Sequence, residues 1–158
     1  MVGNLWDYYF LFLLFFINGN VQSNETTPND ALSFIVNGDF ADPFIEDVSF
    51  LNCESEIKIN ALFFGIFTIK NDWNKAIWNS KGYRINDNNK IELVIACKDK
   101  CSSMESSEGL DAMLDYAFLY SGIDYENNII LEIKPSTQRV DKALALIKDY
   151  CPGYKSLF

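Results

Sequence analysis

The amino-acid sequence predicts an α/β fold with a mainly parallel sheet, formed by four successive strand–helix units. Apolar runs rich in β-branched and aromatic residues mark the strands, and residues with helical spacing follow each run. Regular alternation of strand and helix is typical of parallel sheets with right-handed crossovers. The predicted strands are Leu32–Val36, Ala61–Ile69, Ile91–Ala96 and Ile129–Ile133.

Capping residues mark the start of the first two predicted helices. Asp42 and Pro43 have the character of an N-cap and a first-turn residue. A second helix is expected from a cap at Asn71 or Asp72 to Gly82, and Trp73 and Trp78 would diverge on it, which favours a core position for one or both over a sugar-binding platform. The remaining helices are expected at Ser102–Tyr120 and around Val140, Leu144 and Ile147.

The first residues predict entry into the secretory pathway. Tyr8–Ile17 is an unbroken apolar run, which is shorter than the roughly 20 residues of a membrane-spanning helix. Val21 and Ser23 suit a cleavage site, so residues 1–23 are expected to be a signal peptide. An uncleaved membrane anchor is the alternative, because no Lys or Arg precedes the run. Residues 24–31 are expected to form a flexible polar tail before a single domain over residues 32–158.

Composition excludes several function classes. The net charge is −9 at pH 7 and no strongly basic stretch occurs, which argues against a nucleic-acid partner. The absence of histidine excludes Ser-His-Asp and Cys-His catalysis and most zinc sites. No metal, no cofactor and, after signal cleavage, no membrane association are expected. Asn24 begins an N-glycosylation triplet, which is consistent with a secreted protein or one in a secretory or lysosomal lumen.

Four cysteines predict two disulfides in an oxidising compartment. Three pairings are possible, and the short separation favours Cys97 with Cys101, which leaves Cys53 with Cys151. Free buried thiols are the alternative. Cys97 and Cys101 also stand between a predicted strand and a predicted helix, as a thioredoxin-like redox pair would. Three intervening residues instead of two favour a structural disulfide.

Several features occur in an order known from one enzyme family. Gly38-Asp39 follows the first predicted strand, Phe63–Phe67 lies in the second, and Val94–Cys97 leads the third into a cysteine pair with Cys101. The segment from Gly38 to Tyr154 thereby resembles the first half of a glycoside hydrolase family 25 lysozyme, of the nematode and amoeba type. The resemblance implies a shortened (β/α)8 barrel, a muramidase-like activity and a cell-wall glycan as partner.

The resemblance also implies the site residues. Asp39 and Glu132 would be the carboxylates, whereas Lys134 occupies the place of the general-acid glutamate. A lysine titrates near ~10.4 and cannot serve as a tuned carboxylic acid. The expected function is therefore a degenerate lysozyme-like protein that binds peptidoglycan or another extracellular glycan. A half-buried carboxyl group ~5–9 Å from Glu132 in an open groove would reverse the expected loss of hydrolysis. The alternatives are a thioredoxin-like redox domain and a non-catalytic interaction domain.

Overall fold

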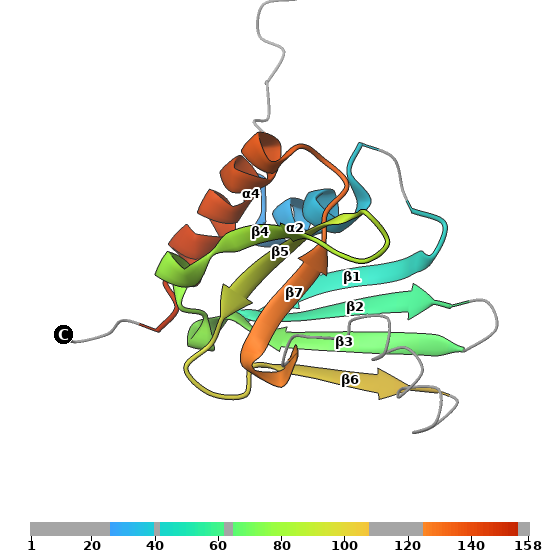
Figure 1. Cartoon of the computed structure of the whole chain (residues 1–158). Helices are drawn as coiled ribbons and strands as arrows, with labels where there is room; N and C mark the ends of the chain where they lie inside the picture. Colours follow the sequence, from blue (N-terminus) through green and yellow to red (C-terminus); the bar gives the residue numbers. More distant parts are fainter. Residues whose placement is uncertain (1–25, 40–41, 62–64, 108–124, 155–158) are drawn as a thin grey trace, which may run out of the picture.

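The computed structural model describes residues 26–39, 42–61, 65–107 and 125–154. Within these residues the chain forms two antiparallel sheets, of four and three strands, and two α-helices (Figure 1). The predicted signal peptide, Asn24 and most of the helix predicted from Ser102 lie outside the described residues.

The four-stranded sheet has the order β1-β2-β3-β6. Every pair of adjacent strands in this sheet is antiparallel. The prediction of a mainly parallel sheet and a partial (β/α)8 barrel is therefore wrong. A two-residue turn joins the first two strands, and such a short connection permits only an antiparallel hairpin. The strands are β1 (Ile45–Leu51), β2 (Glu54–Asn60), β3 (Ile66–Asp72) and β6 (Ser102–Ser106).

The three-stranded sheet has the order β4-β5-β7 and is also antiparallel throughout. Its central strand β5 (Ile91–Ala96) is flanked by β4 (Gly82–Ile85) and β7 (Asn128–Glu132). The predicted strands at Ile91–Ala96 and Ile129–Ile133 therefore exist, but they pair directly with each other in opposite directions.

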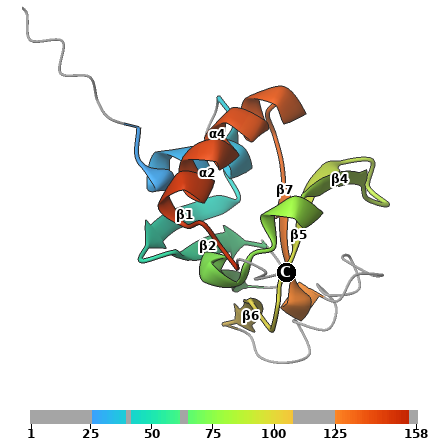
Figure 2. The ribbon, with the colours of Figure 1, turned by 90° about the vertical axis from the view of Figure 1, so that its left-hand side faces the viewer.

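Helices α2 (Pro28–Asn37) and α4 (Thr137–Tyr150) pack against each other, and α2 also contacts β1 (Figure 2). Their apolar faces meet the three-stranded sheet in one core, because every helix buries an apolar stripe against another element. Side chains from both helices, from β5 and β7 and from the turn after β3 are almost wholly buried there: Leu32, Ile35, Trp73, Leu93, Ile95, Ile129, Val140 and Ile147.

Two segments have the opposite secondary structure to the predicted one. Leu32–Val36 is part of helix α2, which begins at Pro28 inside the expected flexible tail and is capped by Thr27. The segment after Asp42 is strand β1 and not a helix. Its residues alternate between the two faces of the sheet and pair with β2, so the apparent helical spacing of its apolar residues was coincidental.

The predicted helix after Asp72 is replaced by two short 3-10 turns, η1 (Trp73–Lys75) and η2 (Trp78–Ser80). The two indole rings stack at a centroid distance of 5.7 Å. Trp73 is fully buried, and the indole nitrogen of Trp78 donates a hydrogen bond to the carbonyl oxygen of Cys151. Trp73 is therefore part of the core, and Trp78 packs against it. The predicted helix at Ser102 is also wrong at its start, because Ser102–Ser106 is strand β6.

Both predicted disulfides are confirmed. Cys53–Cys151 joins the β1–β2 turn to the end of α4. In that turn Asn52 and Cys53 have φ values of 53° and 64°, as a two-residue hairpin loop of type I′ requires.

Cys97–Cys101 closes the loop by which the chain passes from β5 to β6, and hence from one sheet to the other. Backbone hydrogen bonds from the amides of these two cysteines to Asn127 and Glu126 fix the loop against η3 (Tyr125–Asn127).

Candidate functional site

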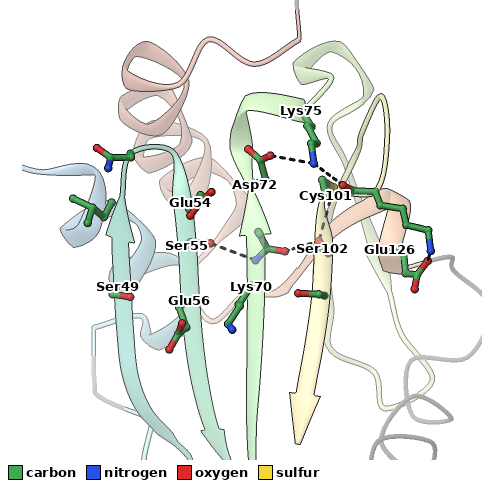
Figure 3. Close-up of a pocket in the computed structure, with 15 residues that line it drawn as sticks. Ser49, Glu54, Ser55, Glu56, Lys70, Asp72, Lys75, Cys101, Ser102 and Glu126 are labelled. Carbon is green, nitrogen blue, oxygen red and sulfur yellow. Dashed lines mark hydrogen bonds and ion pairs between the residues drawn. The ribbon is translucent and has the colours of Figure 1, made fainter.

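A polar groove lies across the four-stranded sheet, on the face turned away from the helices (Figure 3). We call it the outer groove. Its volume is about 580 Å³. Residues from β1, β2, β3, β6 and the adjoining turns line it, among them Ser49, Leu51, Asn52, Glu54, Glu56, Lys70, Asp72, Lys75, Lys100, Ser103 and Glu126.

The pleat of the sheet places these side chains. Along β2 the buried positions are Ser55 and Ile57, so Glu54 and Glu56 point to the opposite face. Strand register then puts Glu56 opposite both Ser49 of β1 and Lys70 of β3, and Lys70 opposite Ser103 of β6. A hydroxyl, a carboxylate, an ammonium group and a second hydroxyl thus stand in one row across the four strands.

A neighbouring row brings two carboxylates together. Glu54 is the direct cross-strand partner of Asp72, and like charges in that position destabilise a sheet. Lys75 offsets the charge of Asp72, with its ammonium nitrogen 3.2 Å from the carboxylate. Among the described residues Glu54 has neither a hydrogen bond nor an ion pair through its side chain, and it is exposed.

The cations around the groove are held by neighbours. Lys70 Nζ lies 2.9 Å from both carboxylate oxygens of Glu105, and this hydrogen bond raises the pKa of Lys70. Lys75 Nζ donates to the carbonyl oxygen of Lys100 over 2.9 Å, and Lys100 forms an ion pair with Glu126. The groove therefore presents fixed donors as well as acceptors.

A buried polar network supports the groove from below. Trp73 Nε1 and Asn71 Nδ2 both donate to Ser55 Oγ, at 2.9 and 3.4 Å. Ser102 Oγ is 2.5 Å from Asn71 Oδ1 and 2.9 Å from the carbonyl oxygen of Asn128. Such satisfied networks rigidify the elements that they connect. This one joins β2, β3 and β6 to the start of β7, so the floor of the groove is fixed.

The two predicted catalytic carboxylates belong to separate ion pairs. Asp39, just after α2, accepts two hydrogen bonds from Arg139 at 2.6 and 2.8 Å, which lower the pKa of Asp39. Glu132, the last residue of β7, binds Lys90 and Lys134 instead. The general-acid position of Lys134 is implied by analogy with a parallel strand, whereas among the described residues β7 pairs only with β5, in the antiparallel direction. That assignment therefore has no support in the fold.

A second carboxyl group, Asp42, does lie beside Glu132. Lys134 Nζ is 2.8 Å from Glu132 Oε1 and 2.9 Å from Asp42 Oδ2. These two carboxylate oxygens can therefore be no further apart than the sum of the two distances. This maximum separation lies near the lower end of the ~5–9 Å that separates the two catalytic carboxyl groups of glycosidases.

The pKa of Asp42 is shifted in the direction opposite to that of a general acid. Burial would raise the pKa of Asp42, but the hydrogen bond from the Phe44 amide and the Lys134 ammonium group outweigh it, and the pKa is lowered. A general acid needs a raised pKa. The three groups form an ion triad with the Lys134 ammonium group between the two carboxylates.

Comparison with protein-family models, with curated proteins and with solved structures gave no match. In the part of the chain that the structure describes, no three or more acidic or cysteine side chains are grouped to hold a metal ion. No helix of those same residues is long and apolar enough to cross a membrane.

Sequence reasoning missed the groove because Glu54–Asn60 was assigned to no element. The pattern Glu-Ser-Glu-Ile-Lys-Ile-Asn alternates polar and less polar residues, which is the ordinary signature of a half-buried strand. Together with the preceding Asn52 turn it could have predicted a β-hairpin with Glu54 and Glu56 on its exposed face.

Proposed function

We propose that this chain is a secreted, disulfide-stabilised binding domain that holds an extracellular glycan, such as peptidoglycan, in the outer groove without cleaving it. The observation that carries the proposal is the placement of Glu54 opposite Asp72, with no cation bound to Glu54 among the described residues. An arrangement that costs stability is typical of a binding surface, where function and stability compete.

The chemistry of the groove supports a sugar ligand. The row Ser49, Glu56, Lys70 and Ser103 places a carboxylate and an ammonium group between two hydroxyl groups, so it can both accept from and donate to sugar hydroxyl and amide groups. The spacing of neighbouring strands, ~4.8 Å, is comparable with the length of one sugar unit. A chain with net charge −9 would repel strongly acidic polymers.

That the domain leaves the glycan intact is part of the proposal. Glycosidic hydrolysis requires one carboxylic acid that stays protonated near neutral pH, whereas Asp42, the carboxyl group beside Glu132, has a lowered pKa. Secretion is supported by the two disulfides, since such bonds persist in oxidising compartments.

Binding to insoluble peptidoglycan and to chitin tests the proposal. The secreted protein, its Glu56→Gln variant and its Lys70→Met variant would be compared by depletion isotherms, with product analysis for cleavage. Loss of one charge-assisted hydrogen bond should weaken binding roughly tenfold or more. Asp87→Asn, a matched neutralisation in the exposed loop between β4 and β5, should bind as wild type. Equal binding by all four proteins, or none by wild type, would refute the groove as a glycan site.

Glu54→Gln separates a binding role from a structural one. Removing the repulsion with Asp72 should raise the free energy of unfolding by about 0.2–1 kcal/mol, while glycan binding weakens. A variant that gains stability and keeps full affinity would show that Glu54 does not contact the ligand.

A further inference from the structure

A second concavity lies between the two sheets, away from the outer groove. We call it the inter-sheet cavity, and its volume is about 240 Å³. Aliphatic side chains from both sheets and from α2 form its walls: Val36, Ile45, Ile57, Ile59, Ile69, Ile130 and Leu131. Ile45, Ile59, Ile69 and Ile130 remain only partly buried around it.

Charged residues surround the mouth of this cavity. Lys134 bridges Asp42 and Glu132, and Lys90 Nζ lies 3.0 Å from Glu132. Side-chain exposure rises from 15% at Asp42 and 22% at Glu132 to 36% at Lys134 and 52% at Lys90. The most accessible charge is therefore Lys90, which has a single carboxylate partner among the described residues.

An apolar space of this size favours a hydrocarbon ligand. An engineered cavity of ~150 Å³ with aliphatic and aromatic walls binds benzene and stays free of water. The inter-sheet cavity is larger, and a ligand within it would remove the four partly buried isoleucines from water, which is favourable. Its open mouth suits a chain whose polar end stays at the surface.

The charged residues at the mouth favour one kind of head group on such a ligand. The two lysines and two carboxylates sum to zero, and each is already paired. An anionic head group would have to displace Glu132 or Asp42 on a chain of net charge −9, and a cationic one would have to displace a lysine. A zwitterionic head group can place its anion on Lys90 and its cation on Glu132 without leaving a charge unpaired.

We propose that the inter-sheet cavity binds the aliphatic chain of a single-chain amphiphile whose zwitterionic head group pairs with Lys90 and Glu132. This site lies on a different face from the outer groove and does not depend on glycan binding.

Titration calorimetry with decylphosphocholine, below its critical micelle concentration, tests this site in the secreted protein. Decanoate and decyltrimethylammonium serve as anionic and cationic comparisons. The zwitterion should bind about tenfold more tightly than either, the difference that one charge-assisted contact supplies. No binding, or equal binding of all three amphiphiles, would overturn the proposal.

Two variants locate the ligand. Ile69→Phe fills the cavity and should abolish binding of decylphosphocholine, whereas Ile85→Phe, at an exposed position on β4, should not change it. Far-UV circular dichroism checks that both are folded. Should Ile69→Phe fail to fold, Lys90→Gln decides: this exposed substitution should weaken zwitterion binding several-fold and leave decyltrimethylammonium binding no weaker. Unchanged binding of the zwitterion by folded Ile69→Phe or by Lys90→Gln would refute the site.

Discussion

At Gly153 the chain leaves α4 with a φ of +69° and passes directly over the turn after β3. A Cβ atom added there would lie 2.4 Å from the carbonyl oxygen of Ala76 and 2.7 Å from the Trp78 ring. The Ala76 oxygen also accepts the backbone hydrogen bond from Tyr154, so it cannot move freely. This glycine is therefore required both by backbone conformation and by close approach.

Gly153→Ala should lower the free energy of unfolding by about 1–3 kcal/mol, because it combines an unfavourable φ with a backbone clash. Urea denaturation followed by tryptophan fluorescence measures the change. Gly82→Ala is the control, since its added Cβ would meet only the Ser80 carbonyl oxygen, at 4.0 Å. Equal effects of the two substitutions would contradict the packing at Gly153.

Asp42 should contribute to the stability of the protein in a pH-dependent way. Its pKa is lowered in the folded chain by the Phe44 amide and Lys134, against the opposing effect of burial. A lowered folded pKa means that the stabilisation is fully present above the unfolded value of ~3.9 and is lost as the pH falls through the folded value. Unfolding free energies of wild type and Asp42→Asn between about pH 5 and pH 2 should converge as acidity increases. A constant difference across that range would contradict the ion triad.

The site residues could be predicted only in part, because their partners come from distant segments. Both disulfide pairs followed from counting cysteines and comparing their separations. The partner of Asp39 is Arg139, a hundred residues away, and that of Asp42 is Lys134. No local pattern marks such pairs. The groove residues Glu54 and Glu56, by contrast, lie in a segment whose local alternation of polar and less polar residues marks a strand.

Helix α4 and strands β5 and β7 were predicted as the structure has them. Helix α4 has an apolar stripe over four turns, and β5 and β7 are compact apolar runs. Leu32–Val36 is too short for its periodicity to separate strand from helix. The deciding feature is the upstream capping box, in which Thr27 and Asp30 bond reciprocally.

Thr27→Ala should therefore destabilise the protein by about 1 kcal/mol, the usual contribution of an N-cap. The Thr27 hydroxyl and amide exchange hydrogen bonds with Asp30 at the start of α2. Ser136→Ala is a matched control, because Ser136 is the N-cap of α4 but makes no side-chain capping bond. Thermal unfolding of both variants provides the measurement, and similar shifts in Tm would argue against a specific role of the Thr27 cap.

For the molecule as a whole, the sequence predicted four parallel strands, whereas the described residues form seven strands in two antiparallel sheets. Alternation of strands and helices implies a parallel sheet only if the intervening segments are helices. Here the segment after Asp42 is a strand and that after Asp72 is a pair of short turns, so successive strands fold back as hairpins or cross to the other sheet. The wrong assignments after Asp42 and after Asp72 therefore changed the predicted order and direction of the strands as well as the local elements.

The two disulfides should contribute unequally to the stability of the whole chain. Cys53 and Cys151 are 98 residues apart, whereas Cys97 and Cys101 are 4 apart. The chain-entropy relation gives about 4.7 kcal/mol for the long loop and about 2 kcal/mol for the short one.

The double variants Cys53→Ser/Cys151→Ser and Cys97→Ser/Cys101→Ser, compared by urea denaturation, measure the two contributions. The first should be the less stable. A larger loss from the second pair would mean that the crossover loop, rather than the tie between hairpin and helix, limits stability.

The docking of α2 against α4 has a consequence for biosynthesis. Leu32 and Ile35 emerge from the ribosome early, but Val140 and Ile147, which share their core, are translated about a hundred residues later. Contacts of such long sequence separation form slowly. Until α4 is released, the apolar face of α2 has no helical partner and stays exposed, so the nascent chain should bind a chaperone between the synthesis of α2 and that of α4.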